Sequence, residues 1–302
     1  MDAFISHSSV NAAFSRELER ALENQGLDVW LDSSDMPNAL MLRRTLREAI
    51  RDAHALVLLW SEAASKSRWV NSEWITAVLM DRPILPCSLD ATGLPECLGG
   101  AAFAPRVDAA PLARSIRAAS GTTVKLTPLV RHESGDLSAA ISELAQLQMA
   151  VVEATDKASQ AAAQREADAA MKRALARWPQ DLMVANLAAY HLKNAYMTDH
   201  WDDLMAGVAP ADERLERAER LFFDALWADP HDPSAINGLG TVLAFEHEPE
   251  AAEFFILAAI RMAEERGLGS YPAAEHDLEL ARRVIRADQA APAGARSGGG
   301  RD

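Results

Sequence analysis

The stretch HALVLLWS, residues 54–61, decides the fold of the first part of this chain. Nearly all of its residues are apolar, and polar positions do not alternate with apolar ones. A strand of this composition is typical of parallel sheets, in which helices cover both faces of the inner strands. The stretch therefore predicts an inner strand of an α/β sheet.

The segments on either side of this stretch alternate between short apolar runs and amphipathic helices. We expect strands at 3–6, 27–32, 54–61, 82–90 and 102–109, and helices at 10–26, 42–53, 66–80 and 111–119. Strands that alternate with helices predict a parallel sheet with helices on both faces. In such sheets the ligand crevice lies beyond the carboxyl ends of the strands.

Polar side chains stand at that edge of the predicted sheet. Those that end the first two strands are Ser6, His7, Ser8 and Asp32. The helix at 66–80 starts shortly after the third strand, so its first turns overlook the same edge. Trp69 and Glu73 lie in these turns, and residues four apart share one helix face. An aromatic wall and a carboxylate are therefore expected to face one ligand site.

The second part of the chain differs in character from about residue 121 onward. Residues 121–136 are expected to form a linker. Residues 137–288 are rich in helix-forming residues and are expected to be all helical, with one long helix or two helices over 137–178. The tail at 289–302 consists mainly of Gly, Ala and Arg without periodicity, and we expect it to be disordered.

An internal echo runs through the helical part. ALARWPQD (174–181) and ALWADPHD (225–232) share the pattern A-L-x-x-x-P-x-D, which resembles the end of a tetratricopeptide repeat. Pro179 and Pro230 are 51 residues apart, which is one 34-residue repeat plus 17 residues. We place the extra residues at 196–212, between the two helices of one repeat. The alternative is a generic helical bundle with a chance echo.

Composition and charge exclude several classes of function. The net charge of −14 argues against a nucleic-acid-binding surface spread over the whole protein and leaves open only a local basic patch. The two cysteines, Cys87 and Cys97, predict reduced thiols and no disulfide framework. The first residues do not resemble a signal peptide. No apolar run reaches the ~18 residues of a membrane span, so we expect a cytoplasmic protein without a membrane partner.

Three stretches of the first part together resemble a Toll/interleukin-1 receptor (TIR) domain. They are DAFISHSS (2–9), GLDVWLD (26–32) and SRWVNSEW (67–74), and the resemblance covers residues 1–120. It implies a flavodoxin-like parallel sheet, in agreement with the pattern above. Many prokaryotic members of this family cleave NAD+ between nicotinamide and ribose, whereas others are assembly modules without catalysis.

The enzymes of the family carry a Ser-x-Trp-x-x-x-Glu pattern, which this chain matches with Ser67, Trp69 and Glu73. The resemblance therefore implies that Glu73 is catalytic and that Trp69 and Ser67 contribute to the substrate site. The remaining candidates for substrate binding are Ser6, His7, Ser8 and Asp32. Taken alone, Trp69 fits a core position, Glu73 fits a solvated surface, and the serines fit strand-end caps.

The implied chemistry suits a single carboxylate. Nicotinamide leaves NAD+ as a neutral base and needs no general acid. The transition state is oxocarbenium-like, with positive charge growing on the ribose, and a carboxylate close to the sugar stabilises that charge. NAD+ is then the substrate, and neither a cofactor nor a metal is expected.

The segment MPNALML (36–42) is apolar for a surface loop. Exposed apolar patches commonly mark contact sites, so Met36, Leu40 and Met41 are expected to form an assembly loop, which a neighbouring TIR domain orders over the Glu73 pocket. The alternative is a loop that folds onto its own domain. Family members usually carry a glycine in this loop where the chain has Ala39. Because Asn tolerates left-handed backbone angles, Asn38 is a possible substitute.

Three functions fit these features. The leading hypothesis is an NAD+ glycohydrolase that is activated by self-assembly and acts as a bacterial anti-phage defence effector. In that hypothesis the chain forms a homo-oligomer through contacts of its TIR and helical domains, and a protein trigger binds to the helical repeats. The alternatives are a non-catalytic scaffold and a TIR cyclase that makes a cyclic ADP-ribose signal.

Overall fold

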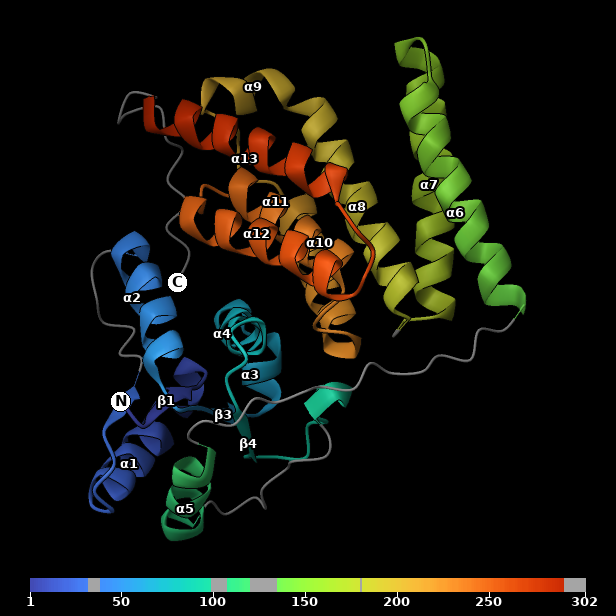
Figure 1. Ribbon diagram of the computed structural model, residues 1–302. Coiled ribbons are helices and arrows are strands. Elements are labelled where there is room, and N and C mark those ends of the chain that lie inside the picture. Colours follow the sequence, from blue (N-terminus) through green and yellow to red (C-terminus); the bar gives the residue numbers. More distant parts are fainter. Residues whose placement is uncertain (32–38, 99–107, 120–134, 180, 291–302) are drawn as a thin grey trace. The chain divides into compact units, whose positions relative to one another are not determined.

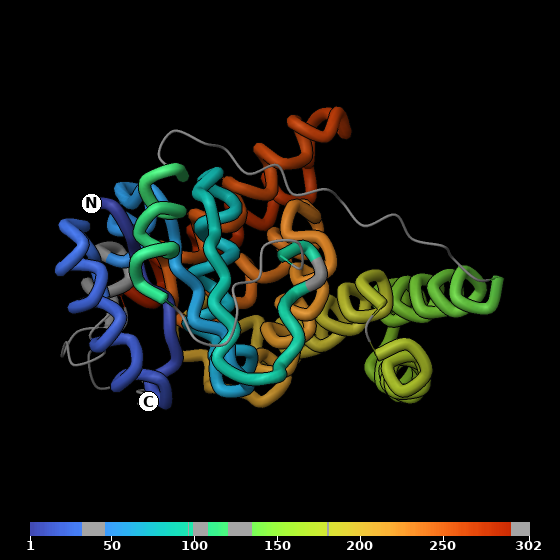
Figure 2. Tube along the Cα trace, turned by 90° about the horizontal axis from the view of Figure 1, so that it is seen from below, coloured from blue at the N-terminus to red at the C-terminus, as the bar shows by residue number. Residues whose placement is uncertain are grey.

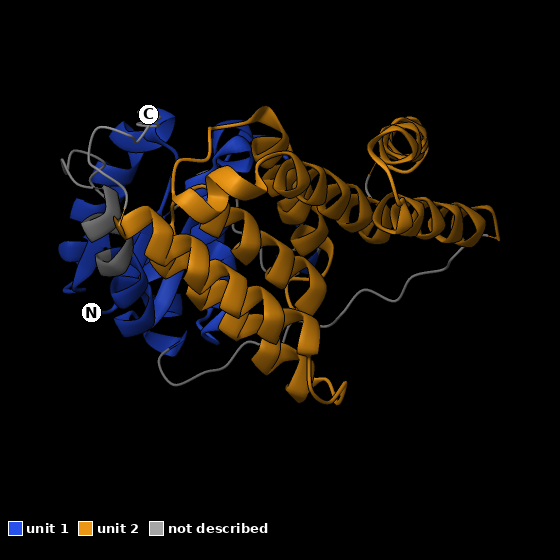
Figure 3. Cartoon of the chain, turned by 90° about the horizontal axis from the view of Figure 1, so that it is seen from above, with its two compact units in different colours: residues 1–128 blue, residues 129–302 orange. Residues whose placement is uncertain are grey.

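The computed structural model describes residues 1–31, 39–98, 108–119, 135–179 and 181–290 (Figure 1). The side chains of residues 39–45 and of residue 96 are outside this description. The chain divides into two compact units, residues 1–128 and 129–302 (Figure 3). Each unit is described by itself below.

The first unit contains a parallel sheet of four described strands. These are β1 (Ala3–Ser6), β2 (Val29–Leu31), β3 (Ala55–Trp60) and β4 (Ile84–Ser88), in the order β2-β1-β3-β4. All three pairings are parallel. Every residue of β1 and β3 is buried, which confirms that these apolar runs are inner strands. The fifth strand expected at 102–109 falls mostly outside the described residues, and Ala109 opens a helix instead.

Helices cover both faces of this sheet, as expected. They are α1 (Ala12–Glu23), α2 (Ala39–Asp52), α3 (Glu62–Lys66), α4 (Arg68–Leu79) and α5 (Ala109–Ala119), with 3-10 turns η1 (Ser9–Asn11) and η2 (Glu96–Leu98). On one face α1 and α5 lie side by side (Figure 2), although they are far apart in the sequence. Leu18 and Leu22 of α1 and Ile116 of α5 pack there against the strands.

The other face of the sheet carries α4, which contacts β1, β3 and β4 and packs against α2. From Val70 to Leu79 every residue of α4 except Ser72 is buried. A helix that is apolar almost all round belongs in a core. This placement brings the first turns of α4 to the carboxyl end of β1.

Two helix boundaries differ from those expected. The helix expected at 66–80 is two helices, α3 and α4, because Ser67 has an extended backbone (φ −81°, ψ 118°) and caps α4 with its side chain. The helix expected at 42–53 begins at Ala39, so Leu40 and Met41 are helical rather than part of a loop.

The second unit consists entirely of helices in its described residues. They are α6 (Gly135–Glu153), α7 (Lys157–Arg177), α8 (Leu182–Asp199), α9 (Trp201–Ala206), α10 (Glu213–Ala228), α11 (Pro233–Phe245), α12 (Pro249–Glu265) and α13 (Pro272–Ala290). The segment 137–178 therefore holds two helices, separated where Asp156 caps α7. The first helix begins two residues inside the expected linker, and α13 extends two residues into the expected tail.

The helices of this unit pack in consecutive pairs, α6 with α7, α8 with α10, and α11 with α12. The sequence echo explains where the pairs meet. Its first copy ends α7 and its second copy ends α10. The aspartate that closes each copy then caps the next helix: Asp181 accepts from the Val184 N–H, and Asp232 accepts from the Ser234 and Ala235 N–H groups. The 17 extra residues contain the end of α8 and the short helix α9.

Among the described residues, the helices that are long enough to cross a membrane lack the apolar composition that a span requires.

Candidate functional site

Hydrogen bonds from polar side chains stabilise the start of α4. Ser67 Oγ accepts from the Val70 N–H at 3.4 Å, which makes Ser67 a helix cap. Asn71 Nδ2 donates to the carbonyl oxygens of Ser65 and Ser67 at 3.0 and 2.9 Å. Asn71 Oδ1 accepts from Trp74 Nε1 at 3.1 Å. These bonds hold the first turns of α4 in one position at the sheet edge.

Glu73 lies in the second turn of α4 and is only 5% exposed. Its Oε2 accepts a hydrogen bond of 2.5 Å from Ser6 Oγ, at the end of β1. Ser6 is fully buried. The interpretation of Glu73 as a solvated surface acid is therefore wrong. In the described part of the first unit, Glu73 is the buried carboxylate, and burying one is costly unless hydrogen bonds compensate.

Trp69 lies one turn before Glu73 on the same helix and is half-buried. The fully buried tryptophan of this helix is Trp74, whose ring belongs to the core. Trp69 is thus partly accessible, one helical turn from the buried carboxylate. An accessible aromatic surface beside a polar group is suited to stacking on a flat ring.

The residues that follow β1 stand near the same edge. Ser8 is buried, and its carbonyl oxygen accepts from the Asn11 N–H at 2.7 Å, which opens the η1 turn. His7 is half-buried, and its Nδ1 has no hydrogen-bond partner among the described residues. Burial lowers the pKa of His7, so the neutral imidazole is favoured.

A second link joins the ends of β1 and β3. Ser61 Oγ donates to Asn11 Oδ1 at 2.8 Å and accepts from the Ala64 N–H at 3.1 Å, as the cap of α3. We did not single out Asn11 or Asn71 from the sequence, and Ser61 was noted there only as a polar residue at the end of the third expected strand. The available signal was cap chemistry, since a Ser or Asn before a helix commonly bonds its first N–H groups. Glu62 is exposed and paired with Lys66 at 2.6 Å.

The remaining candidates lie outside the described residues. Asp32 and Met36 fall in the segment 32–38, and the side chains of Leu40 and Met41 are likewise outside the description. The structure therefore brings together Ser6, Glu73 and the start of α4, with His7, Ser8 and Trp69 on the adjoining segments. Ser67 serves these turns as a cap.

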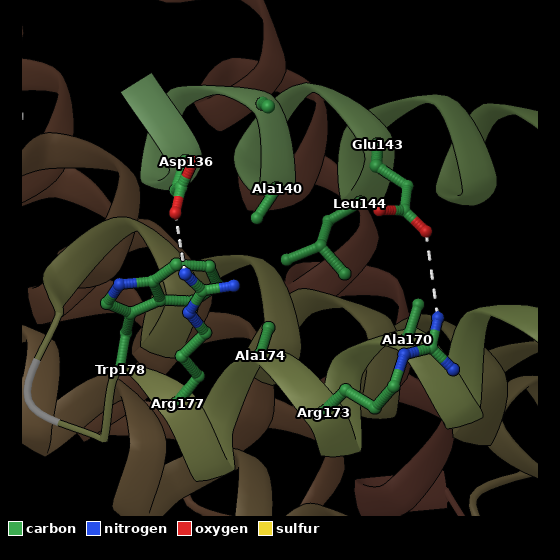
Figure 4. Close-up of a pocket in the computed structure, with 10 residues that line it drawn as sticks. Asp136, Ala140, Glu143, Leu144, Ala170, Arg173, Ala174, Arg177 and Trp178 are labelled. Carbon is green, nitrogen blue, oxygen red and sulfur yellow. Dashed lines mark hydrogen bonds and ion pairs between the residues drawn. The ribbon is translucent and has the colours of Figure 1, made fainter. Parts of the chain in front are cut away.

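The helical unit contains a cavity of about 430 Å³ between α6 and α7 (Figure 4). Small side chains line it from both helices, Ala140 from α6 and Ala170 and Ala174 from α7, and Trp178 lies at one end. The charged groups at its rim pair with each other, as in the 2.6 Å contact of Arg177 with Asp136. Because these charges compensate each other, we assign no chemistry to this cavity.

The parallel four-stranded sheet with helices on both faces fits a known class of domain. A family model for the TIR domain matches residues 3–114, and this part of the chain is a TIR domain. One relative, described as a probable 2′ cyclic ADP-D-ribose synthase, TcpO, of Methanobrevibacter olleyae, is 32% identical over 95 residues. The match covers 30% of this chain and 28% of that relative, so the chain spans less than a third of the relative's length. No solved structure matches the chain.

Proposed function

We propose that the TIR unit cleaves NAD+ at the bond between nicotinamide and ribose, with Glu73 as the catalytic residue. The observation that carries this proposal is the buried Glu73 carboxylate, hydrogen-bonded to Ser6 at the carboxyl edge of the sheet. The similarity to a probable cyclic ADP-ribose synthase supports it, because NAD+ is the usual source of the ADP-ribose group.

Glu73 suits this reaction through its charge and its surroundings. When the glycosidic bond breaks, nicotinamide leaves with the bonding electron pair and positive charge develops on the ribose. A carboxylate in a site with little water interacts strongly with that charge. The Ser6 hydroxyl directs one carboxylate oxygen, and Trp69 supplies an aromatic wall for the leaving ring. His7, Ser8 and Asp32 are further candidates for contacts with the phosphates or ribose, and Ser67 acts indirectly by capping α4.

The product depends on what attacks the ribose after nicotinamide leaves. Attack by water, with loss of one proton, gives ADP-ribose, and the protein is then an NAD+ glycohydrolase. Attack by a hydroxyl group of the same molecule, also with loss of one proton, gives a cyclic ADP-ribose. The similarity to the probable cyclase favours the second outcome, and we carry it as the second candidate function.

The test is to incubate the purified full chain with NAD+ and to identify the products by chromatography. We expect nicotinamide together with either ADP-ribose or its cyclic form. Glu73→Gln should abolish nicotinamide release and leave the circular dichroism spectrum unchanged. Glu62→Gln is the matched control, since Glu62 is an exposed glutamate near the same edge. NAD+ turnover at the wild-type rate by Glu73→Gln would overturn the assignment. Absence of NAD+ turnover in the wild-type chain would favour the hypothesis of a non-catalytic scaffold.

The helical unit is proposed to act as a tetratricopeptide-like assembly element. Its paired helices and capped echoes support this, because stacked helical pairs are used for protein contacts. We propose a cytoplasmic homo-oligomer that responds to a protein trigger, in the manner of an anti-phage defence effector. A fragment cut near residue 125 should remain folded, monomeric and weakly active. A fragment that matches the full chain in activity and in size by light scattering would contradict this role.

A further inference from the structure

Helix α11 is enclosed by the rest of the helical unit. Each of its residues except Ser234 is buried. In an open stack of helical pairs, the first helix of each pair lines a concave surface that is free to bind. Here α10 and α12 pack on α11, and α13 covers it from another side (Figure 1). The last helix of the described chain therefore occupies the surface that a repeat stack offers to a partner.

The contact between α13 and α11 is polar at its centre. Asp277 of α13 accepts from Asn237 Nδ2 at 2.6 Å and from Thr241 Oγ1 at 3.5 Å. Asn237 and Thr241 are at most 1% exposed. Asn237 Oδ1 is buried and has no hydrogen-bond partner among the described residues. Apolar side chains would stabilise the packing of α13 more than polar ones, because a buried polar group without a partner costs free energy. The polar centre therefore indicates a further role for this face.

Lys193 of α8 adds a cation to this centre. The side chain is 4% exposed, and its Nζ lies 4.7 Å from the centroid of the Tyr190 ring. Within the described part of the chain, no carboxylate comes within ion-pair distance of Lys193. Burial lowers the pKa of Lys193, and the charge of Asp277 opposes that shift. The α8–α11 face thus presents two donor groups, Lys193 Nζ and Asn237 Nδ2, and a carboxylate close to them favours the charged form of Lys193.

Two ion pairs tie α13 to the rest of the unit, Arg282 with Glu253 and Asp288 with His247, and three of these four side chains are more than a third exposed. The buried side chains of α13 are small or aliphatic, namely Ala274, Leu278, Leu280, Ala281 and Val284. The link from α12 contains Gly267 and Gly269, both with positive φ and with open space where a Cβ would stand. The first half of α13 carries Glu275, Asp277 and Glu279 and contains no Lys or Arg.

We propose that the α8–α11 face, with Lys193, Asn237 and Thr241, is a binding surface for an acidic protein segment, and that α13 occupies it until such a segment takes its place. Asp277 then holds the position that an acidic side chain of the partner takes. The proposal deepens the proposed role of the helical unit as the receptor of a trigger and rests on it. Its test measures α13 itself and does not depend on NAD+ cleavage.

The first experiment is hydrogen exchange on the full chain, read over residues 272–290. Asp277→Lys places a second cation near Lys193 and should raise the exchange rate of this segment at least tenfold. Glu279→Lys is the matched control, because Glu279 is exposed on the same helix and should leave the rate unchanged. Exchange in α10 and α12 in the same sample reports whether the unit remains folded. Unchanged exchange of 272–290 in a folded Asp277→Lys chain would overturn the proposal.

The second experiment uses a labelled peptide with the sequence of residues 270–290 as the acidic segment. Excess peptide should bind the Asp277→Lys chain. The double variant Asp277→Lys/Lys193→Met should bind the peptide at least tenfold more weakly. A peptide with Asn in place of Asp277 should also bind at least tenfold more weakly. Should Asp277→Lys fail to fold, excess peptide should raise the exchange of 272–290 in the wild-type chain. No peptide binding, or equal binding by both peptides, would also overturn the proposal.

Discussion

The Ser6 hydroxyl donates a hydrogen bond of 2.5 Å to Oε2 of Glu73, and this bond joins the end of β1 to the second turn of α4. The two residues are 67 positions apart in the chain. Hydrogen bonds to charged groups are short and strong, and they direct the lone pairs of the acceptor. Ser6 therefore helps to orient the carboxylate at the sheet edge.

The first prediction concerns Ser6→Ala. Loss of one hydrogen bond to a charged group costs about 1.5–3 kcal/mol. If that loss falls on the transition state, NAD+ cleavage should fall roughly 10- to 150-fold. Ser9→Ala, at an exposed position three residues further along, is the control and should retain full activity. Steady-state nicotinamide release checks both variants. Wild-type rates in Ser6→Ala would show that Ser6 only packs against Glu73.

The second prediction concerns Leu40 and Met41 at the start of α2. Their replacement by charged residues should abolish higher-order species and NAD+ cleavage together, because apolar contacts between neighbouring TIR units would be lost. Specific activity of the wild-type chain should rise steeply with protein concentration. Arg51→Gln, an exposed change at the other end of the same helix, should alter neither property. Activity that is independent of concentration in wild type and variant would show that one chain forms a complete site.

The third prediction separates the two cysteines. Cys87 in β4 is fully buried, whereas Cys97 is partly exposed. Burial raises the pKa of Cys87 from 9.0 to about 12. In the native chain, Ellman's reagent should therefore react with Cys97 and reach Cys87 only after unfolding.

The raised pKa of Cys87 also has a consequence for stability. Between pH 9 and 12 the unfolded chain loses a thiol proton that the folded chain keeps. The contribution of Cys87 to the free energy of unfolding should thus be complete below pH 9 and decrease above it. Urea titrations at pH 8 and pH 10 measure this change, and Cys87→Ala should show a smaller decrease than wild type. Equal decreases would mean that other groups account for the pH dependence.

The fourth prediction concerns Gly238 in α11. A Cβ at this position would lie 2.1 Å from Phe222 Cζ of α10, well inside contact distance. Because Phe222 is fully buried and cannot move aside freely, Gly238→Ala should destabilise the helical unit by about 1–3 kcal/mol. Gly135→Ala is the control, since a Cβ there meets nothing within 4 Å. Urea unfolding followed by circular dichroism measures both, and an unchanged midpoint for Gly238→Ala would contradict the packing argument.

Much of the fold follows from local sequence pattern. The unbroken apolar run at 54–61 predicted an inner strand, and β3 is buried at every position. The proline of the echo predicted where helices end, and the structure adds that Asp181 and Asp232 cap the next helices. Such features depend on residues that are close in sequence, so periodicity and cap chemistry are sufficient to find them. Helix boundaries were less accurate, as the break at Ser67 shows, because a single cap residue can divide one apolar pattern into two helices.

The sequence by itself determined the α/β unit, the helical unit and the candidate carboxylate Glu73. Only the tertiary structure decided that Glu73 is buried against Ser6 and that α11 is enclosed by α13 through Asp277. The physical reason is the range of the interactions. Periodicity shows which face of an element is apolar, but it does not show which distant element covers that face. Burial of a charged side chain depends on partners far away in the chain, and these come together only when the whole unit packs.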